Sequence, residues 1–239
     1  MLRLLPRDPA RARREYYRTA PLWLPPRASQ RQFRFVVFRG GREAFRKIPD
    51  RVRDTETLRR WLVRLAPLHV YFSTATWLDP QHVGPRRLKG PGYPRAYNVY
   101  LSSELYFDID MPGDLRAAKQ EVARIAAHLR ASWGFQDLKV AYSGSKGFHI
   151  HVGDFDLRRL GKRVPLDPAE REAAAEEAKA VIVTDVLERG YAVDVDTTLD
   201  TRRILRLPGT IHGGTGRLCE FIEEARLRWF RPRRVYRPQ

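Results

Sequence analysis

The feature that most constrains this chain is a six-residue stretch, 105–110, in which apolar and polar side chains alternate. Successive side chains of a β-strand point to opposite faces, so the apolar residues would cover a core while Asp108 and Asp110 share the other face. Two neighbouring carboxylates repel each other, and hard divalent cations such as Mg²⁺ or Mn²⁺ favour carboxylate oxygens. The stretch predicts a half-buried strand that carries either a metal site or two solvated acids.

Two later stretches alternate in the same way. His149 and His151 share one face of the first, and Asp194 and Asp196 share one face of the second. If the three strands are neighbours, these groups converge on one patch. Three carboxylates suit a two-metal nucleotidyl-transfer site, in which the cations offset phosphate charge and align the reacting groups. Asp196 is also explained as a local cap or ion-pair partner, and His151 as a core histidine.

A turn rich in small residues, 143–147, precedes the two histidines. Its glycines, Gly144 and Gly147, allow close backbone approach to a phosphate. Ser143 would add a hydroxyl and Lys146 a positive charge. The turn is equally typical of a plain hairpin, so its position beside His149 is what makes it a candidate phosphate site.

The remaining pattern mixes helices with antiparallel strands, which predicts an α+β fold. Thr55, Asp114 and Asp167 stand where helix N-caps are expected. The expected helices cover 8–18, 55–65, 114–133 and 168–189, and the further expected strands cover 34–38, 69–73, 138–142, 203–207 and 218–222. Residues 208–216 are expected to form a loop, and 79–98 either a mobile basic loop or a solvated connection.

Charge and cysteine content narrow the function. The chain has 239 residues with 45 Lys and Arg against 28 Asp and Glu, a formal charge of +17. This excess suits a polyanionic partner such as nucleic acid, although an Arg-rich proteome also raises it. One cysteine, Cys219, supports neither a disulfide framework nor a cysteine zinc site. No apolar run suits a membrane span or a signal core, so a cytoplasmic, nucleoid-associated protein is expected.

Three motifs in order resemble the small, catalytic subunit of archaeal DNA primase, within the archaeo-eukaryotic primase (prim-pol) superfamily. The first is Phe107-Asp108-Ile109-Asp110, and the second runs from Ser143-Gly144 to Gly147-Phe148-His149. The third joins Asp194 to the later run from Arg206 to Gly213. Segments around Tyr16-Tyr17, 31–35 and 69–73 also resemble the family, so the resemblance covers most of the chain.

The resemblance implies a prim-pol fold: antiparallel or mixed sheets flanked by helices, with an RRM-like catalytic half. It implies one catalytic domain over 1–239, made of two closely packed lobes. The family pattern would place two metals, Mg²⁺ or Mn²⁺, on Asp108, Asp110 and Asp194. The residues that would contact the nucleotide phosphates are Ser143, Lys146, His149 and His212, together with Arg206, which is equally explained as a structural ion-pair partner.

The resemblance also implies the reaction and the partners. The enzyme would be a nucleotidyltransferase that makes short primers from NTPs or dNTPs on single-stranded DNA during replication. A large primase subunit is the expected partner, and a stand-alone plasmid, viral or repair prim-pol is the alternative. Two other classes stay open: a His-x-His nicking nuclease that uses Tyr142 or Tyr191 as nucleophile, and a nucleic-acid-binding subunit without activity.

The chain departs from the family pattern at three places. The zinc-binding insertion built from Cys and His is not expected, because only Cys219 is present. Gly214 stands where the family tends to have Lys, so a phosphate contact is either lost or replaced by Arg217. In the N-terminal part, Arg46-Lys47 stands where an Arg-His pair is expected.

Overall fold

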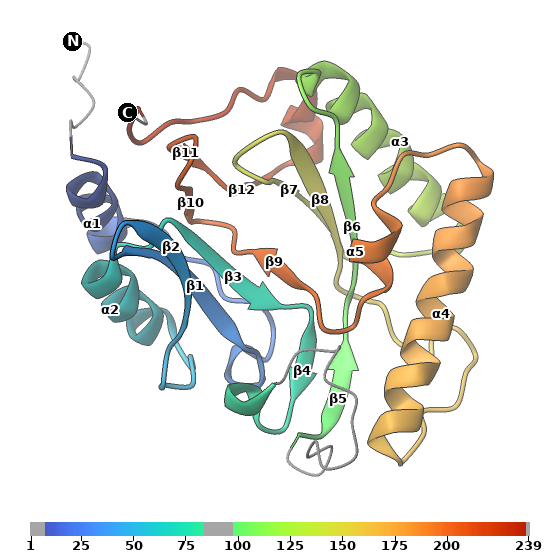
Figure 1. The fold of residues 1–239 in the computed structure, drawn as a ribbon. Coiled ribbons are helices and arrows are strands. Elements are labelled where there is room, and N and C mark those ends of the chain that lie inside the picture. The colour runs from blue at the N-terminus through green and yellow to red at the C-terminus, as the bar shows by residue number, and fades with distance from the viewer. Residues whose placement is uncertain (1–7, 84–97, 238–239) are drawn as a thin grey trace.

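Two four-stranded antiparallel sheets form the centre of the computed structural model, which describes residues 8–83 and 98–237 (Figure 1). The sheets approach each other through aromatic side chains. Phe72 of the first sheet lies 6.2 Å from Tyr106 and 6.3 Å from His151 of the second, measured between ring centroids. The expected α+β class with antiparallel sheets is confirmed.

The first sheet has the strand order β2-β1-β3-β9. Its strands are β1 (Phe33–Arg39), β2 (Arg42–Lys47), β3 (His69–Ser73) and β9 (Ile204–Arg206). Helices α1 (Pro9–Thr19) and α2 (Thr55–Leu65) cover one face of this sheet (Figure 1). Their apolar residues Tyr17, Leu58 and Leu62 share a core with Phe35 and Phe72. The opposite face of the sheet is therefore free of these helices.

The second sheet has the strand order β12-β7-β8-β6. Its strands are β6 (Leu105–Asp110), β7 (Leu138–Tyr142), β8 (Gly147–Val152) and β12 (Glu220–Ile222). Helices α3 (Leu115–Trp133) and α4 (Pro168–Glu188) pack with the apolar residues of β6 and β8 in one core. Phe107 and Ile150 are opposite each other in that core, so the alternation predicted for 105–110 is confirmed.

Aspartate side chains cap the N-termini of the four long helices. The side chains of Asp8, Asp114 and Asp167 each accept a backbone N–H in the first turn of α1, α3 and α4. The cap of α2 is Asp54, which accepts the N–H of Thr57, so the expected cap at Thr55 is wrong by one residue. An ionised carboxylate accepts that N–H strongly and also favours the positive end of the helix.

The strand expected at 191–196 does not form. Asp194 donates its backbone N–H to the carbonyl of Asp108 on β6 (2.9 Å), whereas the N–H of Tyr191 bonds to the carbonyl of Val186 in α4. The short helix α5 (Val195–Leu199) then begins, capped by Asp194. The order β6, α3, β7, β8, α4 and this segment agrees with an RRM-like half, in which a helix cap replaces most of the last strand.

Two single-turn 3-10 helices, η1 (Ala28–Gln30) and η2 (Pro80–His82), and three smaller pieces complete the described chain. The expected loop at 208–216 contains a short strand, because β10 (Ile211–His212) pairs with β11 (Arg217–Leu218). A second ribbon pairs β4 (Ala75–Trp77) with β5 (Tyr100–Ser103). The chain ends with η4 (Glu224–Trp229) and a bridge to β11. Most of the expected basic loop at 79–98 lies outside the described residues.

A buried ion pair joins the two sheets. The Arg31 side chain has no solvent exposure and donates to the carbonyls of Ser73 and Thr74 and to the carboxylate of Glu104, at the start of β6. Tyr106 donates to the other oxygen of Glu104. A buried charge is tolerated only when it is paired and hydrogen-bonded, so this network fixes how the first sheet meets β6.

We expect Glu104→Gln to destabilise the protein by about 3–5 kcal/mol, because it leaves the Arg31 charge buried without a counter-charge. The measurement is the free energy of unfolding in denaturant. The same substitution at exposed Glu43 is the control and should change it by less than about 0.5 kcal/mol. Equal effects of the two substitutions would contradict the role given to the network.

Candidate active site

The pairing of β6 with β8 assembles the predicted polar face. Asp108 is opposite His149, and Asp110 is opposite Gly147. The Nε2 atom of His149 lies 3.5 Å from Oδ1 of Asp108. A β-carbon at Gly147 would lie 2.1 Å from the carbonyl oxygen of Ile109, so only glycine allows β8 to begin this close to Asp110. The expected neighbourhood of Asp108, Asp110 and His149 is confirmed.

Asp108 is electrostatically disfavoured as an anion. Burial, followed by the charges of Asp110 and Asp194, raises its pKa to about 7. Its Oδ1 is buried without a hydrogen bond. The nearby imidazole gives no positive charge, because burial lowers the pKa of His149 to about 3. An additional cation would relieve the repulsion, so these carboxylates fit a divalent metal in charge and in donor type.

Two of the three carboxylates have partners of their own in this structure. Asp110 forms an ion pair with Lys146 at 2.8 Å, and Asp194 accepts the N–H of Thr197 at 2.9 Å as the cap of α5. Among residues 8–83 and 98–237, no three His, Cys, Asp or Glu side chains converge into a ready-made ion site. Lys146 is the counter-charge of Asp110, and Asp194 approaches Asp108 through α5 rather than on a strand.

The turn between β7 and β8 lies against the β10–β11 hairpin. Ser143 Oγ accepts the N–H groups of Ser145 (3.4 Å) and Gly147 (3.3 Å), which closes the turn. Thr215 donates its hydroxyl to the carbonyl of Gly144 at 2.6 Å. A β-carbon at Gly144 would lie 2.8 Å from Cβ of His212. The second and third sequence motifs therefore meet although about 70 residues separate them.

Arg206 lies at the site and is held there by His69 and Tyr71, which the sequence did not predict as site residues. Its guanidinium donates to Nδ1 of His69 (2.6 Å) and to the hydroxyl of Tyr71 (3.1 Å). His69 also accepts the N–H of Gly213 (3.3 Å), and its ring is 4.7 Å from that of His212. Arg206 pairs with no carboxylate in these contacts. The signal in the sequence was the alternation of polar residues along 69–73.

The structure shows the surroundings of the residues at which the chain differs from the family pattern. Lys47 pairs with Arg34 and Arg46 with Phe35, so Lys47 and Arg46 lie on opposite faces of β2. Gly214 is exposed beside the ring of His212. Arg217 donates to the hydroxyl of Tyr142 at 3.2 Å. The Arg217 guanidinium therefore stays near the β7–β8 turn.

His151 belongs to the core between the sheets. Its ring is buried among those of Trp23, Tyr106, Phe72 and Phe221, and its Nε2 has no hydrogen bond. Burial lowers its pKa well below the usual value for histidine. The interpretation of His151 as a core histidine is therefore confirmed. Tyr142 is also fully buried and donates to the carbonyl of Ser145. Tyr191, the other candidate nucleophile, packs against His128 and Arg124 of α3, so this geometry gives the nicking-nuclease hypothesis no support.

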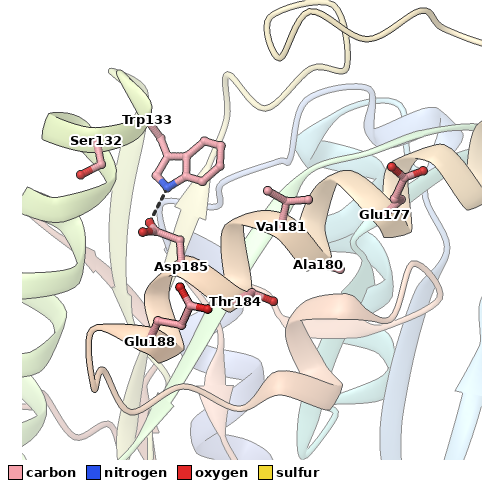
Figure 2. A pocket seen from close by; sticks show the side chains of 8 residues that line it. All are labelled: Ser132, Trp133, Glu177, Ala180, Val181, Thr184, Asp185 and Glu188. Carbon is pink, nitrogen blue, oxygen red and sulfur yellow. Dashed lines mark hydrogen bonds between the residues drawn. The ribbon is translucent and has the colours of Figure 1, made fainter.

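An open hollow of about 570 Å³ lies elsewhere, between the last turn of α3 and the outer side of α4 (Figure 2). Asp185 lines it and accepts from the indole N–H of Trp133 at 2.8 Å, the bond drawn in Figure 2. None of the motif residues lines it. This hollow is a joint between two helices and is separate from the carboxylate face. No helix within the described ranges is long and apolar enough to cross a membrane.

Comparisons with known proteins agree with the motifs. The family model "DNA primase small subunit" matches residues 107–224. The "DNA primase small subunit PriS" of Pyrobaculum calidifontis is 30% identical over 85% of this chain and 74% of its own length. That of Archaeoglobus fulgidus is 25% identical over 88% of this chain and 78% of its own. Among solved structures, the polymerase domain of Mycobacterium tuberculosis Ligase D in complex with DNA matches at TM-score 0.48 and 17% identity, over 91% of this chain and 70% of that one.

We expect Asp108→Asn to stabilise the metal-free protein. The raised pKa means that, between about pH 4 and 7, the unfolded chain releases a proton that the folded chain retains, so stability falls as the pH rises through this window. The neutral side-chain amide of the Asp108→Asn variant does not ionise, so the variant does not lose this stability. The melting temperature at pH 8 should rise by several degrees, given about 2–4 °C per kcal/mol at this chain length. Asp196→Asn is the exposed control, and an unchanged or lower melting temperature for Asp108→Asn would contradict the repulsion.

We expect His151→Phe to make the protein less sensitive to acid. The lowered pKa means that the unfolded chain binds a proton below about pH 6.5 that folded His151 does not, so stability is lost as the pH falls. Phenylalanine keeps a ring among the same aromatic neighbours. Denaturant unfolding between pH 7 and pH 5 should show a shallower loss than in the wild type. An unchanged slope would show that His151 does not contribute.

Proposed function

This chain belongs to the family of DNA primase small subunits, and we propose that the carboxylates on the polar face of β6 catalyse its reaction. The chain is a nucleotidyltransferase, the catalytic subunit of a primase for DNA replication. The observation that carries the site assignment is the placement of Asp108 and Asp110 on one face beside the Ser143–Gly147 turn, with the pKa of Asp108 raised to about 7.

Asp108, Asp110 and Asp194 would hold two divalent cations, Mg²⁺ or Mn²⁺. Bound there, the cations supply positive charge to the phosphates of the incoming nucleotide and to the attacking 3′-hydroxyl. The charge repulsion at Asp108 supports this assignment. Lys146 contacts only Oδ2 of Asp110, and the amide of Thr197 donates only to Oδ1 of Asp194, so each carboxylate keeps a second oxygen for an ion.

Five further residues would bind and orient the nucleotide. Lys146 would contact the phosphates together with Ser143 and His149 from the same turn and strand. Arg206 would contact them from β9, and His212 from the β10–β11 hairpin. Positive groups aimed at the phosphates stabilise the charge that develops as pyrophosphate leaves. The exposed carboxylate of Asp194 is the candidate acceptor of the 3′-hydroxyl proton.

The biological setting follows from the same proposal. The chain would act as one catalytic domain of two packed lobes on a single-stranded DNA template, in the cytoplasm with the nucleoid. A large primase subunit would complete a heterodimer and assist the start of each primer. Ribonucleotides and deoxynucleotides are both candidate substrates.

We expect Asp194→Asn to reduce nucleotide addition by about 100-fold or more, the usual scale for loss of a group that handles a proton in catalysis. The assay is extension of a labelled primer on a DNA template with Mg²⁺ or Mn²⁺. Asp196→Asn is the matched control, since it makes the same chemical change two residues away on α5 and should retain activity. Full activity of Asp194→Asn would refute its assignment.

The same assay on unprimed single-stranded DNA tests whether the chain needs a large subunit to begin a primer. Primers made by the chain alone would indicate a stand-alone primase. Extension of a supplied primer without new synthesis would indicate that a large subunit is needed to begin a primer.

A further inference from the structure

Four side chains form a line across the face of the first sheet that α1 and α2 leave free. The register pairs Lys47 with Arg34, Arg34 with Tyr71, and Tyr71 with Arg206, across β2, β1, β3 and β9. Residues opposite each other on neighbouring strands project to the same face. At about 4.8 Å per strand, the line is about 14 Å long. We call these four residues the cationic row.

The cations of the row have only neutral partners in the contacts of the described residues. Arg34 donates to the side-chain carbonyl of Gln32 at 2.6 Å, and Lys47 lies 3.4 Å from the carbonyl of Gln81. Burial lowers the pKa of Arg34, and burial together with the charge of Arg34 lowers the pKa of Lys47. Like charges held together without carboxylates indicate a place for an external anion.

Aromatic rings accompany the row. Phe45, next to the row on β2, is 65% exposed, and its ring lies 6.2 Å from that of Tyr71. The guanidinium of Arg206 lies 4.9 Å from the centre of the Tyr71 ring. A groove of positive charge with an exposed aromatic ring is the combination by which proteins hold single-stranded nucleic acid, since any base stacks on the ring.

The row leads into the candidate active site. Arg206, its last member, contacts His69, whose ring meets that of His212. Lys47 is three strands away, so one nucleotide bound at Arg206 would not reach it. The length of the row therefore fits a strand of several nucleotides better than the phosphates of one nucleotide.

We propose that the cationic row and Phe45 bind the single-stranded template next to the active site. Lys47 and Arg34 contact its phosphates, and Phe45 stacks on one base. The identification of the bound strand as the template rests on the proposed function. The binding is independent of sequence, because it uses phosphates and a base face rather than base edges.

The test is equilibrium binding of a fluorescent oligo-dT of about 15 nucleotides, by anisotropy, without nucleotide or metal. Phe45→Ala should weaken binding by about 5- to 100-fold, the effect of removing one stacking ring, and should leave the salt dependence unchanged. Lys47→Ala should instead reduce the slope of log K against log salt by about 0.7, the loss of one phosphate contact. The two variants thus separate stacking from charge.

The control is Arg64→Ala on α2, which removes an exposed arginine from the helices that cover the opposite face of the sheet. It should bind like the wild type. Thermal unfolding of each variant checks the fold, which is expected to survive because Phe45 and Lys47 are exposed. Because no catalysis is involved, inactivity in primer extension would count against the proposed function and not against this surface.

Binding by Phe45→Ala and Lys47→Ala within twofold of the wild type would overturn the proposal and leave the row as a surface for an acidic protein partner. An equal loss in Arg64→Ala would also overturn it, because the binding would then follow net charge rather than this face.

Discussion

The antiparallel register between β6 and β8 is the constraint on which the rest of the site depends. It places Asp108 against His149 and brings Gly147 up to Asp110, while Phe107 and Ile150 meet on the buried face. A shift by one residue would turn the carboxylates into the core and the apolar residues into solvent. The core formed with α3 and α4 therefore fixes the register, and the register fixes the chemistry.

The carboxylates on the polar face of β6 repel one another. The core side is fully apolar, but the other side holds three carboxylates, one of which is buried enough to have its pKa raised to about 7. Lys146 offsets part of that charge at Asp110. The neutral imidazole of His149 does not add to it. Such a site loses stability without cations, which agrees with residues selected for binding ions and substrate rather than for the fold alone.

The second sheet and its β7–β8 turn carry Asp108, Asp110 and Lys146, whereas the first sheet contributes Arg206. Arg206 reaches the site from β9 because β9 pairs with β3, where His69 and Tyr71 hold its guanidinium. The buried pair of Arg31 and Glu104 fixes the contact between the two sheets near the start of β6. Arg206 and the carboxylates of β6 therefore come from separate sheets, and the distance between them is set by how those sheets pack.

The sequence alone determined the elements with a strong period. The alternation at 105–110, the strand at 69–73, and the helices that start at Asp114 and Asp167 were predictable because each local pattern is reinforced by burial on one face or by a capping carboxylate. The ordered motifs also identified the family. The neighbourhood of Asp108, Asp110 and His149 followed from the same alternation and from the turn between them.

Only the tertiary structure decided the rest. Residues 191–196 alternate like a strand, but Asp194 keeps one backbone bond to β6 while its side chain accepts the amide of Thr197 as the cap of α5. His69 and Tyr71 look like ordinary strand residues until β9 places Arg206 beside them. The cationic row exists only because β3 and β9, which are distant in the chain, pair beside the β1–β2 hairpin. Local periodicity specifies which way a side chain points, and long-range pairing specifies what it meets.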